Sequence, residues 1–577
     1  MSFLIGFSPR GVSQSWHRGI DLTAPRWLDQ GVQKWGAFWC SGELTQFARL
    51  ELTPRRSLVC VGRVRLDRRE ILIEKLGRNL PANGKRLGDA ELCLAAFACW
   101  GEKMIEYIQG DFALAIWDSD ARRLFCARDR LGVRPLAYFW HKDCWWISDS
   151  TCFLAQAPGF SDGDLDPVWI SHFLRHGTGE PSKTVYAHVH RLQPGHTLAL
   201  GDGAKEVRAY WSFEIGEPLI LPSQGAYLEQ FNSLLSDAIR DRMPSGTVGI
   251  SMSGGLDSPA LAAKAVEIAG SPGRVVARTM IMDGERDPEW APSRMVARHL
   301  GIRQDLVEAR PLLYDPAWQE RNAHLPEPDM EITSPIAWAE QRRAMREVSS
   351  VWFVGEGPDN ALTFEWRSYL AWLARSKKWG HLSLAGLRYL TSKSLEEWKQ
   401  TVGHRLRPGT KSLTGLDHHW IPKLPLEYSP EVQQTHSWRP LADRSWRTTY
   451  LWTSLFEGLD SLNAPYGIEW RHPYLDLELL DFMLRTPPIP WARNKRILRE
   501  IMKDRLPAPV VNSPKVPGTD DATAEAIRAR PPSLPTKGSP TEAFVSLDKI
   551  PEDPFSSGDP YPLARLAVLH HWLEGRP

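Results

Sequence analysis

The pattern of apolar and polar residues divides the chain into two parts. Up to about residue 213, short apolar runs such as RSLVCVGRVRL and HTLAL lie between turn-forming residues, which is typical of β-strands. FALAIW and RLFCAR flank the turn DSDAR and predict a hairpin. DAELCLAAFACWG has helical spacing. We therefore expect residues 1–213 to form layers of antiparallel sheet with a few helices.

From Pro222 the pattern alternates between helices and strands. QGAYLEQFNSLLSDAIRDRM predicts a helix, GTVGISM a strand, and DSPALAAKAVEIAG a helix with Pro259 near its start and Gly270 at its end. RVVARTMIM, APSRMVARHLG and SSVWFVG continue as strand, helix and strand. Such alternation within residues 222–577 predicts an α/β domain, a parallel sheet with helices on its faces.

The last part of the chain departs from this alternation. Residues 365–500 have a mainly helical pattern. Eight prolines lie between Pro531 and Pro562, so we expect residues 518–562 to form a long, irregular and mobile segment. LARLAVLHHWLEG predicts a final helix that docks onto the body of the protein.

Chain length, net charge and cysteine spacing limit the kinds of protein that this sequence can encode and the partners it can have. A chain of 577 residues is too long for one core, and a net charge of +1 gives no reason to expect nucleic acid as a partner. The seven cysteines all precede residue 153 without a CxxC pair, which is typical of reduced thiols. No apolar run has the length of a membrane span, and the start does not resemble a signal peptide. We expect a cytoplasmic protein.

The stretch SMSGGLDS, which follows a predicted strand and begins a predicted helix, has the chemistry of an anion site. Backbone N–H groups at a helix start attract phosphate, and glycines allow close approach of the backbone. A carboxylate in such a loop repels an anion unless a cation lies between them, so Asp257 predicts Mg²⁺. The residues proposed to hold ATP or pyrophosphate here are Ser251, Ser253, Gly254, Gly255, Leu256, Asp257 and Ser258.

These motifs resemble those of a known family. SGGLDS resembles the pyrophosphate loop of the ATP pyrophosphatase superfamily, whose members activate carboxylates as acyl-adenylates. GDFALAIWDSDARRLFCARDRLGVRPLAYF is similar to the class II (Ntn-type) glutaminase domain of asparagine synthetases, and RHPYLDLELLDFML and NKRILREIMKDRLPAPVVNSPK to their synthetase domain. The resemblance implies a glutaminase-like domain over residues 1–213, a synthetase domain over residues 222–577, and the use of ATP and Mg²⁺.

The first domain departs from the family at its expected catalytic residue. The resemblance implies a cysteine nucleophile directly after Met1, but this chain has Ser2, a much weaker nucleophile, and Cys40 lies too far along. VCVGRVRLDRREIL stands where the family has an asparagine–glycine stretch for glutamine. We therefore expect a degenerate domain that makes no ammonia, so that the substrate itself must supply the amine.

The stretch VGEGPDNAL resembles the lasso peptide cyclases, or lasso macrolactam synthetases, within the asparagine synthetase B-like family. These enzymes join the N-terminal amine of a leader-free core peptide to an Asp or Glu side chain. The resemblance implies a lasso core peptide as substrate, with a leader-binding protein and a leader peptidase as partners. A β-lactam synthetase-like or asparagine synthetase-like ligase for a small molecule, and an inactive scaffold, stay open as alternatives.

The same resemblance implies roles for individual residues. Asp257 and Asp359 are the expected Mg²⁺ ligands, Lys515 the catalytic lysine, and Glu356 either a group that orients or deprotonates the amine or a structural carboxylate. Other residues have less defined expected roles: Lys495 and Arg499 at phosphates or in helix packing, Met280 and Gly355 as backbone contacts to adenine, and Arg471 and Asp476 as a site wall or a structural pair.

Overall fold

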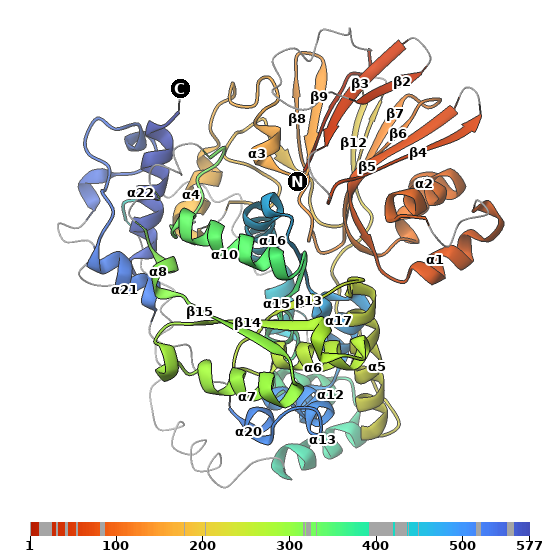
Figure 1. The fold of residues 1–577 in the computed structure, drawn as a ribbon, viewed down its shortest axis with the longest axis vertical. Coiled ribbons are helices and arrows are strands. Elements are labelled where there is room, and N and C mark those ends of the chain that lie inside the picture. The colour runs from red at the N-terminus through yellow and green to blue at the C-terminus, as the bar shows by residue number, and fades with distance from the viewer. Residues whose placement is uncertain are drawn as a thin grey trace.

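The computed structural model contains three β-sheets, two of six strands and one of five (Figure 1). The residues that it describes are 2–10, 26–30, 33–40, 44–53, 56–80, 87–177, 179–201, 204–315, 318, 325–330, 332–391, 419–421, 436, 438–447, 449–514, 521–550, 555 and 559–576. All structural statements below refer to these residues.

Two antiparallel sheets form the N-terminal domain, as the sequence predicted. The predicted hairpin is confirmed, because β6 and β7 pair with Asp118 opposite Arg123. The first sheet has the order β10-β8-β9-β1-β3-β2, with bounds His190–Arg191, Ala137–His141, Cys144–Ser148, Phe3–Phe7, Gln33–Cys40 and Arg26–Gln30. The second has the order β12-β11-β7-β6-β5-β4, with bounds Ala204–Ala209, His196–Gly201, Arg123–Arg128, Gly110–Asp118, Arg56–Leu66 and Gln46–Thr53.

Burial of apolar side chains explains how these sheets stack. Phe3, Ile5 and Phe7 of β1 share one buried cluster with Val59 and Val61 of β5, so the two sheets pack face to face. Helices α1 (Arg69–Leu76) and α2 (Asp89–Trp100) pack on the outer face of the second sheet. Helices α3 (Thr151–Leu154) and α4 (Pro167–His176) pack on that of the first. The domain therefore has helix–sheet–sheet–helix layers.

The second domain is built on a fully parallel sheet of order β15-β14-β13-β16-β17. This arrangement confirms the prediction from alternating strands and helices. The strands are Arg303–Glu308, Val275–Ile281, Val248–Ser251, Val351–Phe353 and Glu469–Arg471, in that order. The helices up to β16 are α5 (Gln224–Arg242), α6 (Asp257–Ala269), α7 (Trp290–Leu300), α8 (Arg310–Leu313) and α10 (Pro335–Val348).

Helices dominate the chain after β16, as expected. Before β17 these are α11 (Pro358–Ala361), α12 (Trp366–Arg375), α13 (Trp379–Thr391), α15 (Pro440–Arg447) and α16 (Thr449–Asn463). After β17 they are α17 (Leu477–Arg485), α18 (Pro488–Trp491), α19 (Arg496–Met502) and α20 (Ala508–Asn512). Their buried faces join the sheet in the largest apolar cluster of the protein.

The proline-rich tail is more regular than its composition suggested. Residues Ala522–Ala529 form α21, which Asp521 caps by accepting a hydrogen bond from the backbone of Ala524. Ile527 of α21 is fully buried in the cluster that contains α4. The expectation of an irregular segment was therefore wrong for α21. The final helix α22 (Tyr561–Glu574) does dock, and it lies near α4 (Figure 1). Arg565 of α22 donates to the carbonyl of Leu174 in α4 at 2.9 Å.

Buried ion pairs join the two domains. Arg63 of β5 contacts Asp460 of α16 at 2.6 Å, and Arg134 contacts Asp460 at 3.1 Å and Glu469 of β17 at 2.5 Å. Burial alone would raise the pKa of Glu469, but the guanidiniums of Arg471 and Arg134 lower it to about 2. These carboxylates therefore stay charged at neutral pH.

Among the described residues, no helix has the length and apolarity required to cross a membrane.

Asp460→Asn should strongly destabilise the protein. The change leaves the guanidiniums of Arg63 and Arg134 buried with less opposing charge, which typically costs about 3–5 kcal/mol. Urea unfolding followed by tryptophan fluorescence measures the loss. Glu51→Gln breaks an exposed pair with Arg49 and is the control, with an expected loss below about 1 kcal/mol. Equal losses in the two variants would show that the interdomain pairs contribute little.

Candidate functional site

The candidate site lies where the strand order of the parallel sheet reverses direction. Chain order runs outward from β13 through β14 to β15 on one side, and from β16 to β17 on the other. β13 and β16 are hydrogen-bonded neighbours, with Gly249 opposite Trp352. Because connections leave these two strands in opposite directions, their carboxyl ends border the crevice in which open α/β sheets bind ligands. SMSGGLDS follows β13, and GEGPDNA follows β16.

The loop after β13 is organised by its own serines. The Ser258 hydroxyl accepts a hydrogen bond from the Ser253 backbone N–H at 2.8 Å, and the two hydroxyls lie 3.1 Å apart. The Ser253 hydroxyl accepts from the Gly255 N–H at 3.2 Å. The loop thus turns sharply into α6, whose first residue is Asp257. Leu256 is buried beneath the turn, whereas Ser251 is exposed at the end of β13.

Two carboxylates and one ammonium meet between the loops. The Lys495 ammonium lies 2.7 Å from the Asp359 carboxylate and also contacts that of Asp257. Asn494 and Lys495 both have positive φ angles, 48° and 54°, which non-glycine residues rarely adopt. Such backbone strain is concentrated at functional sites, and here it orients the lysine. Lys495 was expected near phosphates, but in the structure it lies between the two predicted metal ligands.

The donor set suits Mg²⁺. Asp257 and Asp359 already converge on one cationic atom, and carboxylate oxygens are the ligands that Mg²⁺ prefers. Asp359 is about half exposed, with 48% of its side chain accessible, so the position can exchange ligands with solvent. The predicted pair of metal ligands is therefore brought together, with Lys495 placed to exchange with a metal ion.

Close backbone approach fixes the distance between the two loops. A Cβ atom on Gly355 would lie 3.1 Å from the Ser258 backbone nitrogen, so any larger residue would push the loops apart. Gly357 has a φ of 126°, and a Cβ atom added to it would lie only 3.1 Å from the Cβ of Tyr474. The buried Tyr474 hydroxyl donates to the Asp257 carbonyl at 3.0 Å. The glycines of GEGPDNA are thus required by packing at this position.

The other predicted residues lie around this centre. Glu356 is exposed in the loop after β16, and Met280 is 39% exposed near the end of β14, next to β13. Arg499 donates to the carbonyls of Val511 and Ser513, which favours the packing interpretation over phosphate contact. Lys515, the predicted catalytic lysine, lies outside the described residues.

Arg471 and Asp476 have separate structural partners. Arg471 pairs with Glu469 at 2.7 Å. Asp476 pairs with Arg242 at 3.3 Å and caps α17 through the backbone of Glu478. The structure therefore supports structural roles for both, but with different partners from the Arg–Asp pair that was considered.

Glu289 is a residue that sequence reasoning missed. Its carboxylate accepts a hydrogen bond from the Gly254 N–H, one of the backbone donors predicted to hold pyrophosphate. A carboxylate is thus bonded where a phosphate oxygen is expected, much as Lys495 lies where a metal ion is expected. No local motif marks Glu289, since it lies just before α7 and reaches the loop only through the fold. A ligand phosphate must compete with it.

In the N-terminal domain, an arginine lies near the start of β1, where a glutaminase nucleophile was expected from the sequence. The carboxylate of Asp149 accepts a hydrogen bond from the Phe3 backbone at 2.9 Å, directly after Ser2. The same carboxylate lies 3.6 Å from the Arg63 guanidinium. Ser2 and Arg63 are both buried. Arg63 belongs to the stretch VCVGRVRLDRREIL, so a charged side chain lies beside the position expected for a glutaminase nucleophile.

Comparison with known proteins agrees with this architecture. Residues 73–211 match the glutamine amidotransferase domain, and residues 230–532 match asparagine synthase. The asparagine synthetase [glutamine-hydrolyzing] 3 of Bacillus subtilis is 24% identical, over 87% of this chain and 85% of its own. The amidase chyE of Penicillium rubens is 23% identical, over 74% of this chain and 72% of its own.

These matches confirm the expected fold class: antiparallel sheets of the Ntn glutamine amidotransferase type are followed by a parallel-sheet synthetase domain. The asparagine synthase match alone spans more than half of the chain. The protein belongs to the asparagine synthase family.

Proposed function

We propose that the protein is an ATP-dependent, AMP-forming ligase that closes a macrolactam ring in a lasso core peptide. The family indicates an ATP-dependent ligase of the asparagine synthetase type, and the ring-closing reaction is the finer part of the proposal. The observation that carries the ATP-dependent chemistry is the convergence of Asp257, Asp359 and the SMSGGLDS loop at the switch point of the sheet. This arrangement combines a phosphate site with a cation site.

In the first step a substrate carboxylate attacks the α-phosphorus of ATP. The bond between the α-phosphorus and the bridging oxygen breaks, and pyrophosphate leaves towards the backbone donors of Ser253 to Gly255. Asp257 and Asp359 would hold Mg²⁺, which would supply positive charge to offset that of the triphosphate. Lys495, released from the two carboxylates, is placed to contact the phosphates. The product is an acyl-adenylate.

In the second step an amine nitrogen attacks the acyl carbon. The carbon–nitrogen bond forms, the bond to AMP breaks, and the amine loses one proton. Glu356 is the proposed acceptor of that proton, since it is exposed in the loop between β16 and Asp359. Lys515 is the proposed cation that stabilises the charge developing on the leaving phosphate. Met280 and Gly355 are the proposed backbone contacts to adenine.

The N-terminal domain supports an amine source other than glutamine. Ser2 replaces the expected thiol, and the buried Arg63 guanidinium shares the Asp149 carboxylate with the Phe3 backbone. A domain of this kind supplies no ammonia, so a substrate that carries its own amine is favoured. A core peptide does so, and its N-terminal amine and Asp or Glu side chain give a lactam on loss of one water. The proposed partners are a leader-binding protein and a leader peptidase.

GEGPDNAL also supports the peptide substrate through its resemblance to lasso cyclases. Asn360 of this stretch donates to the hydroxyl of Ser445 in α15 at 2.6 Å, which ties the Asp359 loop to the neighbouring helices. The second candidate function is amide formation on a small molecule, either β-lactam closure or asparagine synthetase-like chemistry. It is favoured by the similarity to the Bacillus subtilis asparagine synthetase over most of the chain.

Incubation with ATP, Mg²⁺ and the leader-free core peptide encoded nearest the gene, without glutamine, tests the proposal. Mass spectrometry should show loss of one water from the peptide, together with AMP and pyrophosphate. Asp257→Asn should reduce the rate about 100-fold or more, because charge stabilisation at the phosphates is lost. Asp237→Asn, on the neighbouring helix α5, removes the carboxylate of an exposed pair with Arg240; it is the control and should keep the activity. An unchanged peptide, combined with amide formation from aspartate and ammonium, would favour the small-molecule candidate.

Ser2→Cys should not restore glutamine hydrolysis. The thiol replaces the missing nucleophile, but the buried Arg63 guanidinium still pairs with Asp149, whose carboxylate accepts a hydrogen bond from the next residue, Phe3. Glutamate release from glutamine, measured by a coupled dehydrogenase assay, is expected to stay at the level of the unchanged protein. The double variant Ser2→Cys, Arg63→Gly removes this side chain as well. Clear hydrolysis by Ser2→Cys alone would contradict the view that the domain is degenerate.

Glu289→Gln should tighten the binding of a non-hydrolysable ATP analogue in the presence of Mg²⁺. The change keeps the size of the side chain but removes a negative charge that competes for the Gly254 N–H. A hydrogen bond to a charged group contributes about 1.5–3 kcal/mol, so a tenfold gain is expected. Calorimetry measures it, with Glu285→Gln in the same loop as the control. Weaker binding would show that Glu289 assists the nucleotide.

A further inference from the structure

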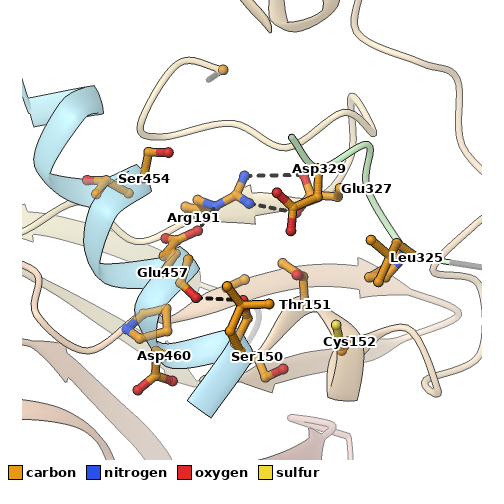
Figure 2. Close-up of a pocket in the computed structure, with 18 of the residues that line it drawn as sticks. Ser150, Thr151, Cys152, Arg191, Leu325, Glu327, Asp329, Ser454, Glu457 and Asp460 are labelled. Atoms are coloured by element: carbon orange, nitrogen blue, oxygen red, sulfur yellow. Dashed lines mark hydrogen bonds and ion pairs between the residues drawn. The ribbon is translucent and has the colours of Figure 1, made fainter. Parts of the chain in front are cut away.

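A cavity separate from the phosphate loop lies between the two domains (Figure 2). Its volume is about 410 Å³, within the range of small-molecule sites. One wall is α16 of the synthetase domain, with Thr453, Glu457 and Asp460. The opposite wall comes from the N-terminal domain, beginning at Asp149, and the segment Leu325–Met330 borders the space. Elements far apart in the sequence thus border one cavity.

Two buried acceptor oxygens, one on each of these walls, have no hydrogen-bond donor among the described residues. Oδ2 of Asp149 belongs to a fully buried side chain and lies 3.6 Å from the Arg63 guanidinium. Thr453 is 5% exposed, and its hydroxyl is likewise without a partner in the described chain. A buried polar group left unsatisfied costs about 1–3 kcal/mol. A ligand that donates hydrogen bonds to both would recover that cost.

The charges around the cavity favour a cationic donor. Arg191 contacts both Glu327, at 2.6 Å, and Glu457, at 2.8 Å, so one guanidinium serves two carboxylates (Figure 2). Desolvation and the nearby Glu327 and Asp329 carboxylates together raise the pKa of the Cys152 thiol to about 11. Six acidic and two basic side chains among the described residues line the cavity, so its lining carries an excess of negative charge. The remaining lining cation, Arg342, lies on α10 and stacks over Tyr466.

The rest of the wall is apolar. The buried aromatic rings of Trp169 and Phe173 in α4 line it, together with Pro135, Leu136 and Ala137. Such a surface would accept a hydrocarbon chain but would not satisfy a second polar group. A ligand that fits both walls therefore has one donor-rich cationic end and one apolar end.

We propose that this interdomain cavity binds a primary ammonium group carried on a short alkyl stem. The ammonium donates to Asp149 Oδ2 and to the Thr453 hydroxyl, and the stem packs against Trp169 and Phe173. The same chemistry occurs in free alkylamines and in lysine side chains of a peptide. This site is independent of the proposed ligase reaction, because no residue of the phosphate loop lines the cavity.

Isothermal calorimetry on the full chain tests the proposal with n-pentylamine as the probe. Millimolar or tighter binding is expected for n-pentylamine, and no measurable binding for n-pentanol, which has the same stem without the charge. Acetyl-Gly-Lys-Gly-amide is the second arm. Tighter binding of this peptide than of n-pentylamine identifies a peptide as the source of the ammonium, and the reverse identifies a free amine. Equal binding of n-pentanol and n-pentylamine, or no binding of either amine, would overturn the proposal.

Thr453→Val isolates the site. It keeps the shape of the side chain, removes the hydroxyl, and should weaken n-pentylamine binding about tenfold. Ser461→Ala is the matched control, since Ser461 also lines the cavity but its hydroxyl donates to the Gly458 carbonyl at 3.2 Å. Its affinity should equal that of the unchanged protein. Thermal unfolding of both variants shows whether the fold is kept. Equal affinities in the two variants would exclude Thr453 and overturn this assignment.

Discussion

The parallel pairing of β13 with β16 is the constraint on which the candidate site depends. Gly249 of β13 lies against the indole of Trp352, and a Cβ atom there would come within 2.3 Å of the ring. This tight pairing sets the distance between the loops that follow the two strands. Asp257 and Asp359, remote in the sequence, thereby reach the same ammonium. The chemistry of the site follows from this strand order and not from either loop alone.

Local motifs predicted those parts of the site that depend on local geometry. The phosphate loop, the start of α6 and the two carboxylates could all be found from the sequence, because strand–loop–helix patterns carry a clear signal. Glu289 and the position of Lys495 could not, since both reach the loop through tertiary packing. The same limit explains α21: proline-rich composition predicted irregular structure, but burial of Ile527 stabilises a short helix. The predicted role of Lys515 rests on the sequence alone.

The N-terminal domain has kept its fold while its charged residues form interdomain contacts. Arg63 lies beside the start of β1 and also contacts α16 of the synthetase domain. A charged side chain at this place costs free energy unless it is paired, and Asp149 and Asp460 provide that pairing. Burial raises the pKa of Asp149 to about 6, although Arg63 opposes this shift. Arg63 thus connects the start of the first sheet with the synthetase domain.

The docking of α22 has a consequence for how the chain can be divided. Ten of the fourteen residues of this helix are buried, and its apolar ones share a cluster with α4 and the first sheet of the N-terminal domain. Helix α22 therefore completes an apolar core that is otherwise formed largely by the N-terminal domain. A cut between the two sequence-defined domains would leave the apolar face of α4 exposed to water, and large exposed faces of this kind promote aggregation. The two sequence-defined domains therefore share an apolar core.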